Sequence, residues 1–413
     1  MRRFTAAGAG EPEISDELWL HVLALRDGHP GAAVAHATGG AELSDALAQA
    51  TEAAATAARM AGAPGPHPGL LAPQPVRAHQ GYDPATARHE PGLGEAVIAA
   101  VVAAAPGLEV DGTWTTRAAE TAIVSTAGLE LHDRVTRAVL ELSVRDPESG
   151  RSGGACGAAA RAGELDAVDV VVRALPLLSP GEPGASQAGP TPVILGPEAV
   201  AAALAFLGRT AFDGLAHTEG RGALAGRLGT RVAASTINLS DSPRFARTLP
   251  AAFDLDGVPK APVPLIQDGV AHRVVHDRRS AARAGGATAS TGHATAPGGA
   301  EDGPRPEHLV LIGGGAADVA ELCAPVARGL YVNRLRYDTA KAGDGSVATA
   351  QGTLLVERGR LAGPATDVRL TADPLAILRG TEALTMAQWL IPHDERASVV
   401  APALRTSGMA VLA

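Results

Sequence analysis

The stretch ETAIVSTAGLELHDRVTRAVLELSVR, residues 120–145, decides the fold of the first half of the chain. β-Branched residues gather there in three short runs, Glu120–Ser125, Leu129–His132 and Arg137–Arg145. A Thr-Ala-Gly turn and an Asp-Arg turn separate the runs, as expected for antiparallel strands joined by tight turns. We therefore predict a β-meander, and a first half in which helices pack on one face of an antiparallel sheet.

Upstream of this meander the sequence predicts a hairpin and then a helix. Leu18–Leu25 reads as a strand, a polar turn follows at residues 26–29, and Ala32–His36 can be the second strand. Ser44–Met60 is rich in Ala and Leu, contains no Gly or Pro, and begins with a residue that can cap a helix. A connector rich in Pro and Gly follows at Pro64–Pro75. Two further segments have helical composition, Gly94–Ala104 and Leu165–Leu175.

The best linker in the chain is SPGEPGASQAGP, residues 179–190. We place the domain boundary there, with an N-terminal α/β domain over residues 1–180, a linker over 181–190 and a C-terminal β-rich domain over 191–413. The second domain is expected to begin with a strand at Val193–Leu195 and a helix at Pro197–Leu207. Short β-rich pieces then follow at Arg231–Leu239, Val270–His276, His308–Ile312, Leu330–Tyr337 and Gly352–Glu357. The predicted fold class is α+β, with antiparallel sheets in both halves.

Composition excludes several classes of protein. The 413 residues carry a net charge of −9 without an evident basic cluster, which argues against a nucleic-acid partner. No apolar run reaches the roughly 18 residues of a membrane span, and no apolar stretch follows Arg2 and Arg3 to make an export signal. Cys156 and Cys323 are too few and too far apart for a disulfide framework. We therefore expect a cytoplasmic protein without a membrane partner.

Two histidine pairs have the spacing of metal ligands. His272 and His276 are four residues apart, as in the H-E-x-x-H zinc motif, but Arg273 stands where the catalytic Glu belongs. The surrounding valines favour a strand, on which residues four apart lie about 13 Å from each other and cannot share one ion. His217 and Glu219 lack an evident third ligand nearby. We expect no metal site in this chain.

Other catalytic signatures are equally weak. Ile312-Gly-Gly-Gly315 precedes a segment of helical composition, Ala316–Ala327, but it matches no phosphate-binding motif and is interpreted as a tight turn. No G-x-S-x-G elbow occurs, and neither cysteine has the context of a nucleophile. The long loop Gly285–Pro306 holds a hydroxyl and an imidazole on either side of a glycine, at Thr291, Gly292 and His293. On these residues alone, a polar loop is the simpler interpretation.

A series of short segments follows the order of motifs in a known family. They are IVSTAG (123–128), LGTRV (228–232), DSP (241–243), FDLDGV (253–258), LIQDG (265–269), TGHA (291–294) and GLYV (329–332). From about residue 111 to the C-terminus, this order resembles the TldD/PmbA family of peptide-processing proteins, also called the modulator of DNA gyrase family. The resemblance departs from the family pattern at Thr126 and Asp256, and in the expanded loops near Gly181 and at Gly285–Pro306.

The family has a catalytic TldD-type subunit, with a zinc-binding H-E-x-x-x-H helix and a distant Cys ligand, and a TldE/PmbA-type subunit without them. Counting back from Leu228-Gly229 places that helix near Ala205–Thr210, where AFLGRT offers no zinc ligand. The resemblance therefore implies a TldE/PmbA-type subunit without catalytic residues, metal or cofactor of its own. Its expected partner is a TldD-type subunit that holds zinc, and Thr291, Gly292 and His293 become candidates for the wall of a substrate channel.

The implied substrate is an unfolded peptide, such as the leader or scaffold peptide of a ribosomally made natural product. Such a chain suits addition of an extended strand to an open sheet edge. Two alternatives stay open. A stand-alone hydrolase would need His293, His217 and Glu219 to converge on a metal or a substrate. A pure scaffold or regulator would bind a protein partner without contacting substrate.

Overall fold

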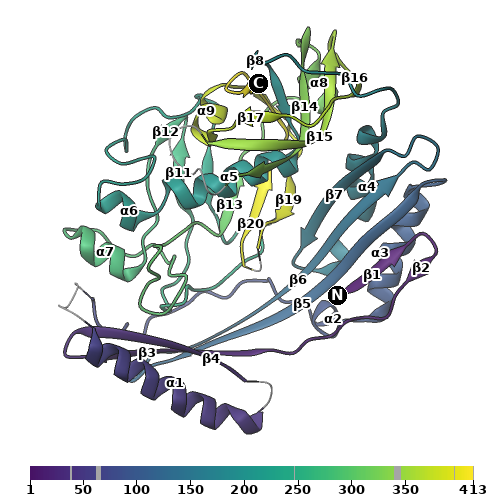
Figure 1. Cartoon of the computed structure of the whole chain (residues 1–413). Helices are drawn as coiled ribbons and strands as arrows, with labels where there is room; N and C mark the ends of the chain where they lie inside the picture. The colour runs from purple at the N-terminus through teal and green to yellow at the C-terminus, as the bar shows by residue number, and fades with distance from the viewer. Residues whose placement is uncertain (38–39, 62–66, 246, 339–345, 395, 413) are drawn as a thin grey trace.

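The computed structural model describes residues 1–37, 40–61, 67–245, 247–338, 346–394 and 396–412. Within these residues the strands form sheets of five, two, six and nine strands, and most neighbouring strands run antiparallel. Figure 1 shows helices packed against the sheets, with the N-terminal strands below and beside the C-terminal ones. The chain is therefore an α+β protein with antiparallel sheets, and the predicted fold class is confirmed.

The N-terminal sheet has the order β2-β1-β5-β6-β7 and carries its helices on one face. Trp114 of β5 and Leu140 of β6 are buried under α3 and α4, whereas Thr113 and Glu141 point to the other face. The elements are β1 Arg2–Thr5, β2 Gly8–Ala9, β5 Glu109–Val124, β6 Glu130–Arg145, β7 Ser152–Ala159, α2 Pro84–Ala87, α3 Pro91–Ala104 and α4 Ala167–Ala174, with 3₁₀ turns at Ala162–Glu164 and Leu175–Leu178.

One predicted turn of the meander is wrong. Asp133 and Arg134 do not reverse the chain but continue the ladder inside β6, with Asp133 opposite Thr121. The Asp133 carboxylate lies 2.9 Å from Nε2 of His79 and accepts a 2.9 Å hydrogen bond from the backbone of Ala252. Because these contacts satisfy the polar side chain within the strand, the local turn signal is overridden.

The predicted N-terminal hairpin forms an arm at one end of the molecule (Figure 1). Strands β3 (Leu18–Arg26) and β4 (His29–Ala37) join through Asp27 and Gly28, both at positive φ. Helix α1 (Gly40–Met60) covers one face and begins before the predicted Ser44. It packs so closely that a Cβ added to Gly31 would lie 2.2 Å from the backbone of Ala54 and of Ala58.

The C-terminal sheets face each other across helix α5 (Pro197–Ala211). The six-stranded sheet has the order β12-β11-β10-β13-β20-β19, and the larger sheet has the order β18-β21-β9-β14-β15-β17-β22-β8 with β16 beside β15. The strands of the smaller sheet are β10 Leu239–Asp241, β11 Val263–Gln267, β12 Val270–Ala271, β13 His308–Leu311, β19 Trp389–Pro392 and β20 Ser398–Ala401.

The larger sheet and the remaining helices complete this half. The strands are β8 Gly189–Pro190, β9 Val193–Leu195, β14 Arg328–Tyr337, β15 Val347–Glu357, β16 Arg360–Pro364, β17 Arg369–Thr371, β18 Thr381–Leu384, β21 Leu404–Thr406 and β22 Ala410–Val411. The helices are α6 Gly214–Thr218, α7 Arg278–Ala284, α8 Val319–Cys323 and α9 Pro374–Arg379.

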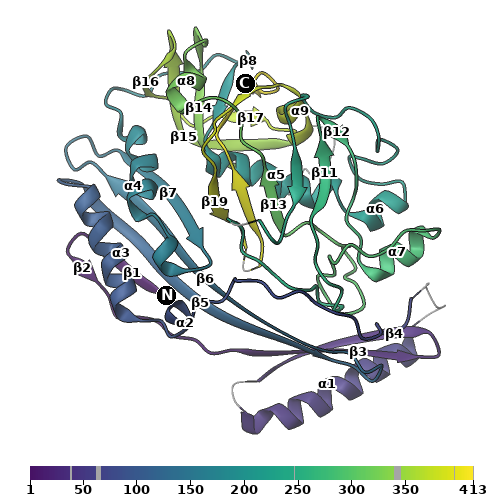
Figure 2. The same ribbon diagram turned by 180° about the vertical axis from the view of Figure 1, so that it is seen from behind.

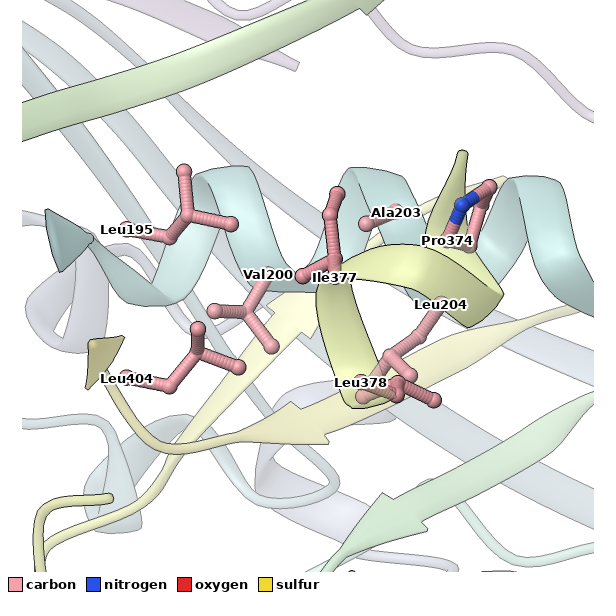
Figure 3. A pocket seen from close by; sticks show the side chains of 8 residues that line it. All are labelled: Leu195, Val200, Ala203, Leu204, Pro374, Ile377, Leu378 and Leu404. Carbon is pink, nitrogen blue, oxygen red and sulfur yellow. The ribbon is translucent and has the colours of Figure 1, made fainter. Parts of the chain in front are cut away.

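Part of the C-terminal core lies between α5 and α9 (Figure 3). Eight apolar side chains meet there and leave no room for a water molecule, namely Leu195, Val200, Ala203, Leu204, Pro374, Ile377, Leu378 and Leu404. With no polar group among them, this point is packed core and offers nothing to a ligand.

Several C-terminal expectations need correction. Arg231–Leu239 is mostly loop, with a single bridge from Arg231 to Val270, and the strand expected at Val270–His276 ends at Ala271. The expected helix Ala316–Ala327 is reduced to α8. Beyond Ala271 a tertiary contact takes the place of the ladder, since Val275 N–H donates a hydrogen bond to Phe212 C=O.

The predicted linker is held against the C-terminal sheet. Gly184 bridges Ala365, and β8 at its end pairs with β22. The division into domains at residues 180 and 190 stays a prediction.

An irregular segment, residues 67–83, runs between the long hairpin β5–β6 and the C-terminal half, as Figure 2 shows from behind. We call it the connecting segment. Arg244 donates hydrogen bonds of 2.8 and 3.0 Å to the carbonyl oxygens of Arg77 and Ala78, and Arg278 donates one of 2.9 Å to Gly69 C=O. No helix in the described part of the chain is long and apolar enough to cross a membrane.

Candidate functional site

The loop Gly285–Pro306 has turns but no helix or strand over its length, and it brings the three predicted channel residues to the C-terminal core. Thr291 is half-buried, whereas Gly292 and His293 are buried. Oγ1 of Thr291 accepts a 2.8 Å hydrogen bond from His276 N–H and lies 2.9 Å from Nδ1 of His293. The hydroxyl therefore connects the loop to the chain before α7 and to the imidazole beneath it.

Gly292 has a backbone that favours glycine. Its φ is +78°, and an added Cβ would lie 3.0 Å from the carbonyl oxygen of Pro259 and 3.3 Å from Cα of Lys260. A side chain here would strain the backbone and push on a neighbouring main chain that cannot rotate away. Gly292 thus allows the loop to approach residues 258–260, and this structural role does not depend on any role in substrate binding.

Beneath the loop lies a group of charged and polar side chains that we call the ionic cluster. Its members are each at most 5% exposed and are Asp241, Lys260, His293, Glu307 and His308. Nζ of Lys260 is 2.8 Å from Oε2 of Glu307. Oδ1 of Asp241 is 3.2 Å from Nε2 of His293 and 3.7 Å from Nδ1 of His308. The half-exposed Arg396, 3.5 Å from Glu307, connects the cluster to the surface.

The backbone also holds the cluster together. Oδ2 of Asp241 accepts hydrogen bonds of 2.7 and 2.8 Å from the N–H groups of Glu307 and His308. Asp254 acts in the same way on the loop, since its carboxylate accepts hydrogen bonds from Ala294, Asp256 and Val258 N–H. Two aspartates thus fix the ends of segments that are far apart in the sequence.

Burial and neighbouring charge set the protonation states. Burial raises the pKa of Asp241, but His293 and His308 outweigh it and hold this pKa well below its ordinary value. Burial also opposes the charge of Glu307, but Lys260 and Arg396 lower its pKa to about 2. Burial and the charge of Lys260 lower the pKa of His293. Nε2 of His293 faces Asp241, and its Nδ1 faces the Thr291 hydroxyl, which also lies 3.1 Å from the carbonyl oxygen of His276.

The other sequence candidates lie outside this cluster. His272 is exposed, and His276 is buried with Nδ1 3.2 Å from Oγ of Ser280. His217 lies on α6, and Glu219 pairs with Arg221 and Arg283. His293 therefore does not come together with Glu219 in a shared ion-pair network. Among the described residues, no group of three or more His, Cys, Asp or Glu side chains is placed to hold a metal ion.

The surroundings of the glycine run and of the two cysteines indicate a packing role and no catalytic one. Gly313 and Gly314 pack on the backbone of residues 384–386, where an added Cβ would lie 2.7 Å from a carbonyl oxygen. Burial raises the pKa of the Cys156 thiol to about 12 and that of Cys323 to about 11, so both are protonated at neutral pH. The segment Ala205–Thr210 lies inside α5, where Ala205, Phe206 and Leu207 are buried.

Sequence reasoning missed Lys260, Glu307 and His308. One signal was available for Lys260, which is one of two lysines among 35 basic residues. In the structure this lysine is a buried ammonium paired with the carboxylate of Glu307. No local pattern marks Glu307 and His308, because their partners lie 47 or more residues away in sequence.

Comparisons with known proteins identify the family to which this architecture belongs. The model of the PmbA/TldA metallopeptidase C-terminal domain matches residues 188–413, which is more than half of the chain. The chain therefore belongs to the PmbA/TldD family. No curated protein matches it by sequence.

Three solved structures with this fold illustrate the similarity. TldE from Thermococcus kodakarensis has a TM-score of 0.83 and 19% identity, covering 100% of this chain and 95% of that one. A proposed modulator of a DNA gyrase from Thermotoga maritima has a TM-score of 0.78 and 18% identity, with coverage of 100% and 94%. Another from Bacteroides thetaiotaomicron has a TM-score of 0.72 and 15% identity, with coverage of 100% and 92%. Along its whole length, the fold is thus TldE-like.

Proposed function

We propose that this chain is the TldE/PmbA-type, non-catalytic subunit of a heterodimeric zinc peptidase. The observation that carries the proposal is the full-length similarity of its fold to TldE, at a TM-score of 0.83. The composition of Ala205–Thr210 supports it, since Ala, Phe, Leu, Gly, Arg and Thr supply no zinc ligand at the position expected for the family's catalytic helix. Zinc and the hydrolytic step belong to a TldD-type partner.

The substrate in this proposal is an unfolded peptide, in particular a leader or scaffold peptide removed during natural-product biosynthesis. The loop with Thr291, Gly292 and His293 forms part of the channel wall in the complex. Thr291 is the half-buried member and is the one positioned toward substrate, while Gly292 and His293 support the loop from beneath. We assign these residues a positioning role and no bond-making step.

Metal content and peptidase activity test the proposal. The chain is purified alone and after co-expression with a TldD-type subunit, and zinc is measured by elemental analysis. We expect zinc and turnover of unfolded peptides only in the complex. Stoichiometric zinc and turnover in the lone chain would establish a stand-alone hydrolase and overturn the proposal. A zinc-active partner that never associates with this chain would overturn it as well.

A pair of variants tests the loop in the active complex. Thr291→Ala removes the hydroxyl that bonds to His276 and His293, whereas Thr291→Ser keeps it. We expect kcat/KM for peptide to fall roughly tenfold in the Ala variant and to stay near wild type in the Ser variant. The zinc content is the control for an intact partner site. Unchanged turnover in both variants would remove the loop from the channel and favour a pure scaffold.

A further inference from the structure

Three basic groups from separate segments lie together in the C-terminal half. Nη1 of Arg209, in the last turn of α5, donates a 3.0 Å hydrogen bond to Nε2 of His393, which follows β19. Arg305 stands between two prolines at the end of the long loop, and a Cβ added to Gly208 would lie 3.8 Å from Cδ of Pro306. The turn of α5 that carries Arg209 therefore packs beside Arg305. We call Arg209, Arg305 and His393 the basic cluster.

The groups of the basic cluster act on one another. Burial and the charge of Arg305 lower the pKa of Arg209. Burial lowers the pKa of His393 against the opposing effect of Asp394, and both arginines lower it further. In the described ranges, neither Arg209 nor Arg305 has a carboxylate partner within 4 Å. Positive charges that are held together without a counter-ion favour the binding of an anion.

Asp394 and Glu307, two described acidic residues close to the basic cluster in sequence, already have partners. Oδ1 of Asp394 accepts hydrogen bonds of 2.9 and 2.6 Å from the N–H groups of Arg396 and Ala397, so this carboxylate closes its own turn. The Glu307 carboxylate lies 2.8 Å from Lys260 and 3.5 Å from Arg396. Both carboxylates are thus committed to other groups, and Arg396 adds a further positive charge to the same region.

The basic cluster lies at the junction of the two halves of the chain. Figures 1 and 2 show the connected ends of β19 and β20 turned toward β5 and β6. Arg137 of β6 donates a hydrogen bond to the backbone C=O of Asp394 at this place. Arg209 and His393 are exposed, and Arg305 is half-buried. An anion in solvent can therefore reach the cluster without any rearrangement of the core.

We propose that the basic cluster binds a carboxylate group of the peptide substrate, either an acidic side chain or the chain end. A guanidinium group is planar, and its paired N–H groups match the two oxygens of a carboxylate. The net charge of −9 opposes a polyanion such as a nucleic acid, whereas one carboxylate adds little to this repulsion. The inference rests on the proposed function for the peptide, and it adds a feature by which the chain selects among peptides.

Three versions of one unfolded peptide test which carboxylate binds. The first carries internal Glu residues and an amidated C-terminus, the second has Gln in place of Glu and an amidated C-terminus, and the third has Gln and a free C-terminus. Isothermal titration of the full chain, without a partner, measures the Kd of each peptide at low salt. We expect a carboxylate version to bind about tenfold more tightly than the neutral version. The version that does so identifies the source of the carboxylate. Equal binding of all three, or binding of none, would overturn the proposal.

Arginine substitutions test whether this selectivity comes from the basic cluster. Arg209→Gln and Arg305→Gln should each weaken binding of the carboxylate peptide about tenfold and leave binding of the neutral peptide unchanged. Arg360→Gln makes the same charge change on β16, which Figure 1 shows away from the connected ends of β19 and β20, and it should keep the wild-type affinity. Thermal unfolding of each variant verifies the fold. Selectivity that survives both cluster substitutions would contradict the assignment. Binding of single-stranded oligothymidylate that depends on Arg209, without binding of any peptide, would identify a nucleic-acid site instead.

The outcome is separable from that of the proposed function, because the lone chain is titrated and no zinc or turnover is needed. Carboxylate-dependent binding in a chain that never joins a zinc-containing partner would leave the basic cluster as a carboxylate site and overturn the proposed function alone. Turnover by a zinc-containing complex, with equal Kd values for all three peptides, would overturn this inference alone.

Discussion

At the scale of single residues, the charged groups of the ionic cluster depend on one another and on their protonation states. Its carboxylates are buried, so each needs its full set of partners to stay charged. Glu307 depends on Lys260 and Arg396, and Asp241 depends on two imidazoles and two backbone amides. Removing one partner leaves the other charge buried and uncompensated.

Acid should therefore weaken the fold through Glu307. The pKa of Glu307 is about 2 in the folded chain and ordinarily 4.5. At pH values between these two, the unfolded state therefore binds more protons than the folded state. This stabilisation, about 3 kcal/mol, is complete above roughly pH 4.5 and is lost as the pH falls toward about 2. Urea unfolding at a series of pH values measures it. Glu307→Gln should remove this part of the pH dependence, while the exposed Glu301→Gln should keep it. An unchanged slope in Glu307→Gln would contradict the assignment.

Asp241 should be the most sensitive carboxylate of the cluster. In Asp241→Asn a neutral amide replaces the carboxylate, and whichever way it points, its NH2 group faces either the two histidines or the backbone N–H groups of Glu307 and His308. We expect a loss of about 3 kcal/mol in the free energy of unfolding. The exposed Asp302→Asn is the matched control and should change it by less than about 0.5 kcal/mol. Equal stability of the two variants would show that the cluster tolerates a neutral group.

At the scale of elements, the loop Gly285–Pro306 is held by a few backbone positions. Gly286 and Gly292 both have positive φ, +61° and +78°, but an added Cβ meets nothing within 4 Å at Gly286 and the Pro259 carbonyl at Gly292. Comparison of the two therefore separates backbone strain from the close approach. The helices around the loop are short, and α7 has the capping box of Asp277 and Ser280 at its start.

Alanine at these two glycines should have unequal effects. Gly286→Ala should lose about 1 kcal/mol through φ alone. Gly292→Ala should lose about 1 kcal/mol more, because the backbone of residues 259–260 must shift to admit the methyl group. Thermal unfolding of both variants under one condition gives the difference. If Gly286→Ala is as unstable as Gly292→Ala, the close approach at Pro259 costs nothing.

At the scale of the whole molecule, two arginines are among the residues that connect the halves of the chain. Arg173 on α4 pairs with Glu198 on α5 and donates a 2.7 Å hydrogen bond to Cys156 C=O on β7. Arg244 reaches in the other direction, from the C-terminal half to the backbone of the connecting segment. Each arginine spans two elements that no local interaction would bring together.

Loss of Arg244 should loosen the connecting segment without unfolding the protein. Arg244→Ala removes both hydrogen bonds to Arg77 and Ala78, and we expect amides of residues 76–81 to exchange about tenfold faster. Hydrogen exchange followed by mass spectrometry measures this directly. The exposed Arg273→Ala should leave that exchange unchanged. Equal exchange in both variants would mean that other contacts hold the segment.

Local sequence was sufficient where short-range signals agree. The run Leu18–Leu25 and the polar turn at residues 26–29 predicted the hairpin β3–β4, and Val193–Leu195 and Pro197–Leu207 predicted β9 and most of α5. The local sequence predicted a turn at Asp133, and this prediction was wrong. The Asp133 side chain instead contacts His79 and the backbone N–H of Ala252 from within a strand. Short-range patterns cannot register a partner supplied by a distant segment.

The sequence by itself determined the α+β class, elements such as the hairpin β3–β4, β9 and α5, and, through the order of its motifs, the family. Only the tertiary structure decided that His293 is a buried partner of Asp241, and that Lys260, Glu307 and His308 belong to the same site. The physical reason is one of range. Backbone periodicity and turn chemistry act over a few residues, whereas a buried charge is stabilised by whatever group the fold brings within about 4 Å.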